Sequence, residues 1–386
     1  MSEPKLTPLG QVAFFQSGGT PDRKRDDYYK GCIPWVTGAD LDADGGISPR
    51  HTISEEAVKG SSTGTAEAGD LLLVTRTSVG KVAIARDPIC FSQDITAVRA
   101  RPGDLDTRYL FHYIRSLERY FTDRSRGATI KGVTREVVRD FNVPIFDLAE
   151  QQRIAQMLDH VDALRVKRRE SIKFLDDFAQ SIFVEMFGDP VANSKGLPQV
   201  DLTEMGTLDR GVSKHRPRND PSLLGGRYPL IQTGDVARSR GYIHSYESTY
   251  SDAGLAQSRL WPQGTLCITI AANIAKTGIL QFDACFPDSV VGFTSDPPVV
   301  EYVQTWLSFL QGNLERMAPE SAQKNINLAT LRSLRILDPG RESIEEFASR
   351  VHSVVTVRAA AAAHLAELDA LFESVQNRAF KGTLWD

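Results

Sequence analysis

The chain has 386 residues, which is long enough for two or three domains with cores of their own. Its 41% of hydrophobic and 24% of charged residues are ordinary for a soluble globular protein. The net charge of −4 argues against a protein coated in basic surface, although a local basic stripe is still compatible with nucleic-acid binding.

Neither a membrane segment nor a metal or disulfide framework is expected. The sequence has no run of about 18 apolar residues, and its first ten residues lack the apolar segment of a secretory signal. The four cysteines show no C-x-x-C spacing and no clustered histidines nearby. We therefore expect a protein of the reducing cytoplasm, with Cys90 and Cys285 packed in its core.

Residues 1–147 predict a mixed α/β domain. Within them, 69–85 predicts a hairpin, because short apolar runs flank a turn at 76–80 that contains a glycine. Residues 107–122 place apolar side chains at helical intervals. A glycine-bearing loop over 124–132 and a short apolar run before Pro144 complete this domain.

A long helix is predicted over 148–188. Asp147 can cap it, with Glu150 three residues later as in a capping box, and no glycine or proline interrupts the pattern before Gly188. An apolar seam with seven-residue spacing runs along this helix and predicts pairing with another helix. The seam residues are Ile154, Val161, Leu164, Arg168, Leu175, Phe178 and Ile182.

The second half of the chain repeats this order. Residues 189–338 predict a second mixed α/β domain, again rich in glycine and short strand-like runs. The segment 339–386 predicts a second long helix, with Pro339 at its first position and Gly382 at its end. Its seam residues are Ile344, Phe347, Val351, Arg358, Leu365, Leu368 and Phe372.

Matching landmarks recur about half a chain length apart. Thr37-Gly38-Ala39-Asp40 returns as Thr233-Gly234-Asp235, and Cys90-Phe91 returns as Cys285-Phe286. An offset of this length indicates two copies of one domain-sized unit, because solenoid repeats have only about 20–50 residues. Two copies can form a pseudo-two-fold object that suits a target in two parts.

The two long helices most simply pair with each other, because neither can bury its apolar seam alone. We expect an α/β (α+β) fold in which two similar domains are joined by an antiparallel, pseudo-two-fold coiled coil that fixes their spacing. Arg168 and Arg358 occupy the same seam position of the two predicted helices. They either set the register of the helices or extend their charged ends into solvent, and the sequence leaves both interpretations open.

Motifs for catalysis are absent from the sequence. Residues 77–81 lack the glycine and the Ser/Thr of a phosphate-binding loop. The DPPV segment (296–299) lacks the aromatic residue with which a D-P-P-Y motif stacks on a flipped base. No histidine pair has the spacing of a metalloprotease site, and no G-x-S-x-G elbow is present. We expect no catalytic residue, metal or cofactor in this chain.

Basic, hydroxyl and amide side chains gather instead in loops of both glycine-rich domains. These residue types contact phosphates and read base edges in protein–DNA complexes. Each residue alone also fits an ordinary solvated surface, so the prediction of a double-stranded DNA surface rests on recurrence at matching places. The predicted DNA-binding residues are Arg23, Lys24, Arg25, Arg76, Ser78, Lys81, Arg124, Arg126, Lys131, Lys214, Arg216, Arg218, Lys276, Gln323, Lys324 and Asn325.

Three longer motifs stand out in the first half of the chain, namely SGGTPDRK…YYKGCIPWVTGADL (17–41), GDLLLVTRTSVGKVAI (69–84) and IKGVTREVVRDFNVPIFDLAEQQRIAQMLD (130–159). In combination they resemble the specificity subunit of type I restriction-modification systems. IQTGDV (231–236), AQKNINLATLRSLRI (322–336) and AFKGTLWD (379–386) repeat this resemblance more weakly. The second helix departs from the pattern, because PGRESIEEFA lacks the Glu-Gln-Gln start.

The resemblance implies a DNA-reading subunit without catalytic activity that takes part in defence against phage. Each target-recognition domain would read one half of a split, asymmetric DNA sequence. The helix pair would fix the spacer and hold two modification subunits, which bind S-adenosylmethionine and methylate DNA. Restriction subunits, which hydrolyse ATP with Mg²⁺, would join the same core.

Two other functions stay open on the sequence alone. The chain could be a DNA methyltransferase or nuclease in its own right, which stoichiometric binding of S-adenosylmethionine to the isolated chain would indicate. It could also be a coiled-coil adaptor that binds only protein, which absent or salt-insensitive DNA binding would favour.

Overall fold

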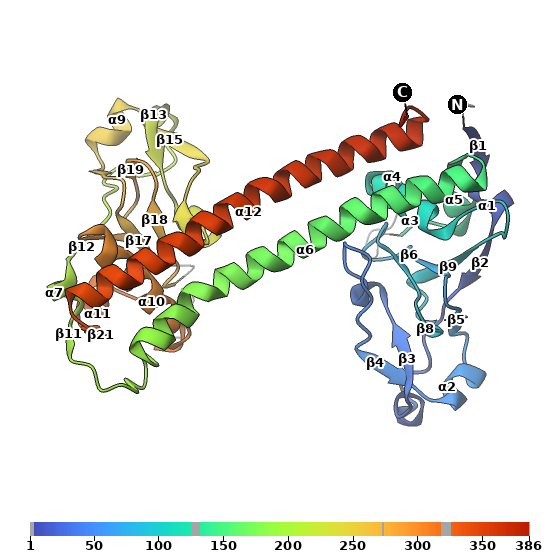
Figure 1. Ribbon diagram of the computed structural model, residues 1–386, viewed down its shortest axis with the longest axis horizontal. Helices are drawn as coiled ribbons and strands as arrows, with labels where there is room; N and C mark the ends of the chain where they lie inside the picture. The colour runs from blue at the N-terminus through green and yellow to red at the C-terminus, as the bar shows by residue number, and fades with distance from the viewer. Residues whose placement is uncertain (1–3, 126–131, 272–273, 318–325, 386) are drawn as a thin grey trace. The chain divides into compact units, whose positions relative to one another are not determined.

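The structure, a computed structural model, describes residues 4–125, 132–271, 274–317 and 326–385. It divides into two compact units: unit 1 is Met1–Lys167 with Leu365–Asp386, and unit 2 is Arg168–His364. The two long helices of Figure 1 are α6 (Leu148–Phe187) and α12 (Arg341–Lys381). Each of them therefore contributes one part to each unit.

Unit 1 has sheets with the strand orders β1-β10, β2-β9-β6-β7 and β4-β3-β8-β5. Its strands are β1 (Lys5–Pro8), β2 (Ala13–Ser17), β3 (Ile33–Val36), β4 (His51–Ile53), β5 (Gly64–Ala66), β6 (Leu71–Val74), β7 (Val82–Ile84), β8 (Ile89–Phe91), β9 (Ile95–Ala100) and β10 (Asn142–Ile145). Its shorter helices are α1 (Leu9–Val12), η1 (Asp26–Tyr29), η2 (Gly38–Asp40), α2 (Glu55–Gly60), α3 (Thr107–Ser116), α4 (Glu118–Arg124) and α5 (Arg135–Arg139).

Unit 2 has sheets with the orders β11-β21, β12-β20-β17-β18-β14 and β15-β13-β19-β16. Its strands are β11 (Gln199–Asp201), β12 (Thr207–Arg210), β13 (Leu224–Leu230), β14 (Gly241–Ile243), β15 (Ser248–Tyr250), β16 (Leu260–Trp261), β17 (Leu266–Thr269), β18 (Thr277–Leu280), β19 (Ala284–Cys285), β20 (Val290–Thr294) and β21 (Arg335–Leu337). Its shorter helices are α7 (Leu202–Met205), η3 (Pro221–Leu223), α8 (Thr233–Arg238), α9 (Asp252–Ala256), α10 (Pro297–Met317) and α11 (Leu328–Arg332).

The repeat predicted from the sequence is also a repeat of topology. Apart from β14, each strand of unit 2 takes the place that its counterpart has in unit 1. The Tyr109 hydroxyl donates to the Pro144 carbonyl at 2.6 Å, and the Tyr302 hydroxyl donates to the Leu337 carbonyl at 2.8 Å. The interval along the chain from Tyr109 to Tyr302 equals the interval from Pro144 to Leu337. The two units are therefore built from equivalent parts.

Strand β6 shows how the sequence fills both faces of the central sheet. All four of its residues are buried, and successive side chains of a strand point to opposite faces. Leu71 and Leu73 pack with α3 and α6, whereas Leu72 and Val74 pack with β3 and β8 of the second sheet. The sheet therefore separates two hydrophobic cores.

Strand β17 repeats this alternation in unit 2. Leu266 and Ile268 belong to one core, and Cys267 belongs to the other. Burial raises the pKa of the Cys267 thiol. Cys90 and Cys285 are buried as well, which confirms the prediction that they are core residues.

The predicted hairpin and helices are present, with different ends in two places. β6 and β7 pair antiparallel, and Gly80 in their turn has a φ of +97°. The helix expected over 107–122 breaks at Leu117, where ψ is 29°, into α3 and α4. Helix α12 begins at Arg341 rather than at Pro339, because the φ of +83° at Gly340 is incompatible with a right-handed helix.

Helix α6 begins and ends where the sequence indicates. The Glu150 N–H donates to the Asp147 carboxylate at 2.8 Å and so caps the first turn. Gly188, with a φ of +77°, follows the last turn. The DPPV segment lies at the start of α10, where a helix tolerates proline. Within the described ranges, every helix is too short or too polar to pass through a lipid bilayer.

Candidate nucleic-acid interface

Several loops of unit 1 meet at one end of its central sheet. Because β2 and β6 both run antiparallel to β9, their last residues lie beside the first residues of β9. Ser17 pairs with Thr96, and Val74 pairs with Ile95. The basic loop after β2, the turn before β9 and the hairpin after β6 therefore leave the sheet at the same end.

Backbone hydrogen bonds tie these loops together and bring a further segment to them. The Thr75 N–H donates to the Asp94 carbonyl at 2.8 Å, and the Val133 N–H donates to the Thr75 carbonyl at 2.9 Å. A cleft of about 580 Å³ lies here, and its lining includes Arg76 and Arg135. Its two guanidinium groups outnumber the one carboxylate of the lining, that of Glu136, so the cleft suits an anionic ligand such as a DNA backbone.

Unit 2 repeats this construction. The Ile270 N–H donates to the Ser289 carbonyl at 3.0 Å, and the Ile326 N–H donates to the Ile270 carbonyl at 3.0 Å. These bonds match those of Thr75 and Val133, residue for residue. Each unit therefore has the same cluster of loops at the same end of its sheet.

Residues 1–173 match the family model for the type I restriction modification DNA specificity domain. This part of the chain is a type I specificity domain. The resemblance predicted from the sequence is thereby confirmed.

Specificity subunits of two organisms are similar to the chain. The MjaIX subunit of Methanocaldococcus jannaschii is 30% identical over 190 residues, and the EcoR124I/EcoR124II subunit of Escherichia coli is 30% identical over 163 residues. These matches cover 48% and 40% of this chain, and 43% and 40% of the two relatives. They therefore span less than half the length of each relative.

The likeness in fold extends over both units. The crystal structure of a type I restriction-modification S subunit from M. genitalium covers 97% of this chain and 96% of its own, with a TM-score of 0.62. The identity is 12%, so this comparison concerns the fold alone. The predicted fold, with two mixed α/β domains and two long helices, is confirmed.

In the specificity domain of unit 1, most predicted DNA-binding residues are exposed. Arg23, Lys24 and Arg25 lie on the loop after β2, and Arg76 lies on the hairpin after β6. The Arg25 guanidinium pairs with Asp27 at 2.5 Å and covers the Tyr28 ring. Arg124 stacks on the Tyr120 ring at 3.8 Å. These cations lie at the surface, where their use for DNA stays a prediction.

Lys81 has a structural contact that the sequence did not indicate. Its Nζ donates to the Leu41 carbonyl at 2.9 Å, which ties the hairpin to the end of η2. Ser78 in the same hairpin is half-buried, and its carbonyl accepts the Lys81 N–H. A lysine bound to a carbonyl has fewer donors left for phosphate than an exposed one.

The TGAD segment that contributes to the resemblance forms a capped turn. The Thr37 N–H donates to the Asp40 carboxylate at 2.7 Å, and Arg50 pairs with the same carboxylate at 2.5 Å. In unit 2, the Gln232 N–H donates to Asp235 at 2.8 Å, so Gln232 is the counterpart of Thr37. The sequence match of Thr37 with Thr233 was therefore wrong by one residue.

Burial alone would raise the pKa of the Asp40 carboxyl. Hydrogen bonds from Arg50 and Thr37 outweigh this effect and hold the pKa below its usual value. Asp40 therefore stays ionised and fixes the turn that also receives Lys81.

In unit 2, the predicted cations Lys214, Arg216 and Arg218 are exposed on the loop after β12. Arg216 and Arg218 both pair with Asp288, in the turn before β20. Lys276 is half-buried beside the start of β18. Arg126, Lys131, Gln323, Lys324 and Asn325 lie outside the described residues.

Sequence reasoning missed several residues of this interface. Arg135 lines the unit 1 cleft and donates to the Ser17 hydroxyl. Arg210, at the end of β12, donates to the Asp288 carbonyl. A search for clustered cations passes over single arginines and over acidic partners such as Asp288. The sequence signal for Asp288 was its position in the tight turn after Cys285-Phe286.

The seam of α6 differs from the predicted one. Leu164 and Phe178 are 40% and 52% exposed, whereas Leu158 and Ile172, on the neighbouring row, are buried. Both rows carry apolar residues, and a helix of 3.6 residues per turn can turn either one inward. Packing decides the choice. Of the other predicted residues, Ile154, Val161 and Ile182 are buried, and Arg168 and Leu175 are half-buried.

The seam of α12 agrees more closely with its predicted positions. Residues four and seven apart face the cores of the two units. Ile344, Phe347, Val351 and Phe372 are buried, and Arg358, Leu365 and Leu368 are half-buried.

The counterpart of Arg358 is Arg165 and not Arg168. Arg358 Nε donates to Asp176 within unit 2, and Arg165 Nε donates to Asp369 within unit 1 at 2.6 Å. The interval from Arg165 to Arg358 equals the interval from Asp176 to Asp369, so the two ion pairs are copies of one interaction. Arg168 forms no ion pair with any described residue.

The two helices run antiparallel in unit 2. In unit 2, Asp176 pairs with Arg358 and Glu185 with Arg350, so rising numbers in α6 meet falling numbers in α12. The parts of α6 and α12 that lie in unit 2 thus form the expected antiparallel pair, and oppositely charged side chains pair across it.

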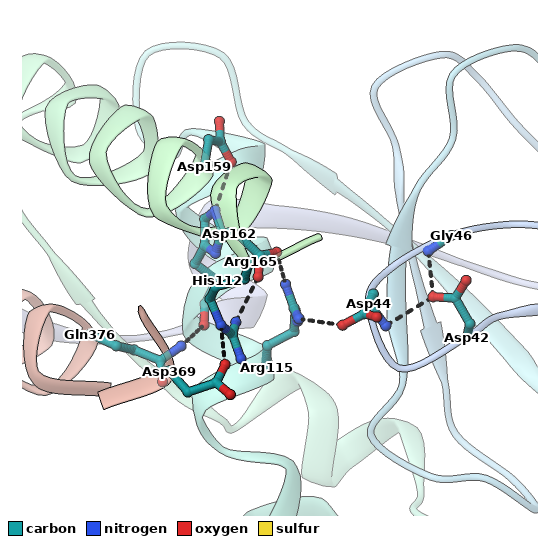
Figure 2. Close-up of polar contacts among 10 residues, drawn as sticks. All are labelled: Asp42, Asp44, Gly46, His112, Arg115, Asp159, Asp162, Arg165, Asp369 and Gln376. Carbon is teal, nitrogen blue, oxygen red and sulfur yellow. Dashed lines mark hydrogen bonds and ion pairs between the residues drawn. The ribbon is translucent and has the colours of Figure 1, made fainter. Parts of the chain in front are cut away.

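A buried network ties α3 to both helices in unit 1, as Figure 2 shows. Arg115 of α3 and Arg165 of α6 each donate to Asp162 at 2.7 Å. Arg165 continues to Asp369 of α12, and Arg115 lies 3.7 Å from Asp44 in the loop after η2. The three central side chains are mostly buried, so losing one would leave its buried partners with one ion pair fewer.

Proposed function

We propose that the chain is the sequence-specific DNA-binding subunit of a type I restriction-modification complex. Each unit would read one half of a bipartite, asymmetric target. The observation that carries the proposal is the duplicated cluster of loops, at the same end of an equivalent sheet in both units. The specificity-domain match over residues 1–173 supports it.

The loops supply two kinds of contact in this function. Exposed cations such as Arg23, Lys24 and Lys214 would neutralise phosphates, which gives affinity without sequence preference. That affinity falls with salt by a logarithmic slope of about −0.9 per phosphate. Base-edge contacts in the major groove add about 1–3 kcal/mol of discrimination for each good bidentate pair.

The chain itself would be non-catalytic in this complex. S-adenosylmethionine, ATP and Mg²⁺ would bind to partner subunits, two for modification and others for restriction. Exposed apolar positions on the long helices support paired docking. Leu164 of α6 corresponds to Val357 of α12, as Phe178 does to Leu371, and all four are at least 40% exposed. Two equivalent surfaces suit two copies of one modification subunit.

The test is a footprint with the chain and its modification partner purified together. We expect protection of two short sequences separated by an unprotected spacer, with affinity that falls steeply as salt rises. A complex without any sequence preference would refute the proposal. Stoichiometric binding of S-adenosylmethionine to the isolated chain would show instead that it is an enzyme in its own right.

A further inference from the structure

Unit 2 holds a cluster of arginines around a single carboxylate. Asp288 lies in the turn between β19 and β20. Its Oδ1 pairs with Arg218, its Oδ2 lies 3.4 Å from an Arg216 amino group, and its carbonyl accepts the Arg210 Nε–H. Three cations from two segments thus converge on one residue at the proposed DNA-reading end of the sheet.

Arg216 is already bound on its other side. Its second amino group donates to the Ser213 carbonyl at 2.7 Å and to the His215 carbonyl at 2.8 Å. The Gln257 side chain accepts the N–H groups of Lys214 and His215 at 2.7 and 3.0 Å. Arg216 therefore shapes the loop, and the loop is ordered before any ligand arrives.

Arg218 keeps most of its donors for a ligand. Its single hydrogen-bond partner among the described residues is Asp288, and its side chain is 45% exposed. A guanidinium carries five N–H donors in a rigid fork. A carboxylate that holds one of them fixes the direction of the rest, which lowers the entropy lost when the fork binds.

The neighbouring carboxylate indicates what Arg218 binds. A phosphate at Arg218 would lie beside Asp288, whose carboxylate offsets part of the positive charge that Arg210, Arg216 and Arg218 gather there. The guanine edge in the major groove offers two acceptors, N7 and O6, without a formal charge, and an arginine fork matches them. Lys214, on the same loop, is exposed and forms no ion pair with the described residues, so it suits a phosphate.

We propose that Arg218 reads a guanine in the half-site of unit 2, and that Asp288 is the residue that positions it. This inference rests on the proposed function and assigns base reading and phosphate contact to different residues of one loop. The equivalent turn of unit 1 has Gln93 in place of Asp288, and Gln93 is exposed. The two units therefore read their half-sites with different chemistry at this turn.

The experiment uses the full chain in complex with its modification partner. Methylation sequencing of cells that express the complex first gives the wild-type target. The probes are then a duplex with this target and duplexes in which each base pair of the unit 2 half-site is substituted in turn. Binding constants are measured for the wild type and for Arg218→Ala, Arg218→Lys, Asp288→Asn, Asp288→Glu and Lys214→Ala.

We expect Arg218→Ala to abolish discrimination at one G·C pair, where the wild type discriminates by about 5- to 150-fold. Arg218→Lys keeps the charge but not the fork, so it should lose the same preference. Asp288→Asn should weaken discrimination at that pair while raising affinity for unrelated DNA, because one negative charge is removed. Asp288→Glu should preserve the preference better than Asp288→Asn.

Lys214→Ala is the matched control on the same loop. It should weaken binding to all probes alike and reduce the salt slope by about 0.9. Discrimination within the unit 1 half-site must stay at its wild-type value in every variant, which shows that the protein is folded.

Three outcomes would overturn the inference. One is a unit 2 half-site without a G·C pair. Another is an Arg218→Ala variant that behaves like Lys214→Ala, which would make Arg218 a phosphate contact. The third is unchanged discrimination in both the Arg218 and the Asp288 variants. If the wild-type complex shows no sequence preference at all, it is the proposed function that fails.

Discussion

At the scale of single residues, acidic partners decide what the basic residues of this chain can do. Asp288 holds Arg216 and Arg218, and Asp27 holds Arg25. The sequence shows where cations recur but not which carboxylates fold against them. For this reason the basic loops could be predicted, while the division of labour within a loop could not.

Asp40 should make unit 1 sensitive to acid. Its folded-state pKa is below the value of about 3.9 expected in the unfolded chain. Its stabilising contribution is therefore complete above that value and is lost as pH falls through the folded-state pKa. Urea unfolding at several values between pH 3 and pH 7 measures this loss. Asp40→Asn should show a smaller dependence on pH, and an unchanged dependence would contradict the prediction.

At the scale of elements, the long helices were the most predictable part of the fold and their facing surfaces the least. Asp147, Gly188 and the uninterrupted pattern between them located α6. The choice between the rows of Leu158 and Leu164 depended on packing against α12 and the sheet domain. The Arg165–Asp369 pair was missed, since charged residues were compared only at the predicted seam positions.

The unit 1 network should contribute measurable stability. Arg165→Ala removes one ion pair from Asp162 and one from Asp369, so we expect the free energy of unfolding to fall by about 1–3 kcal/mol. Arg168→Ala is the matched control three residues away and should change it by less than about 0.5 kcal/mol. Chemical denaturation compares the two variants. Equal changes in the free energy of unfolding for the two variants would show that the network of Arg165 does not stabilise unit 1.

The contact of α3 with α6 in unit 1 carries a basic residue where the equivalent contact of α10 with α12 in unit 2 carries an acidic one. In unit 1, Arg108 of α3 pairs with Asp159 of α6 at 3.0 Å. The equivalent residues of unit 2 are Glu301 and His352. Burial raises the pKa of the Glu301 carboxyl, and a Tyr242 hydroxyl donates to it at 2.6 Å.

A charge exchange tests this polarity. Arg108→Glu places two carboxylates together and should lower the stability of unit 1. In a His112→Thr background, which removes the second partner of Asp159, adding Asp159→His recreates the unit 2 residues and should restore part of the loss below about pH 6, where an unperturbed histidine is charged. A double-mutant cycle at pH 5.5 and pH 8 measures the coupling. Additive effects at both values would show that the two residues do not interact.

At the scale of the whole molecule, the repeat was visible in the sequence because its landmarks kept their spacing. The interval from Tyr109 to Tyr302 is the same as the interval between the ion pairs of the helices. It is slightly longer within the sheet domains, where Cys90 matches Cys285. The extra strand β14 was not predictable, because its short apolar run resembles many loop segments.

If the helix pair sets the spacer of the proposed target, lengthening both helices should lengthen the spacer. A heptad inserted after Lys167 and another after His364 keep the seam in phase. Seven residues add about 10.5 Å, or about three base pairs. Methylation sequencing reads the new spacer directly. A heptad inserted in α6 alone is the control and should abolish methylation. An unchanged spacer in the double insertion would show that the helix pair does not set the spacer.

The reversed polarity of Arg108 and Glu301 limits how new specificities can arise by recombination. A gene that copied the first sheet domain into the second place would set a guanidinium against His352 instead of a carboxylate. In such a shuffled descendant the guanidinium would lack the carboxylate partner that Asp159 gives it in unit 1. Exchange of a domain with the domain at the same position in a related gene avoids this conflict. Such exchanges should therefore be inherited more often than copies of the first domain placed at the second position.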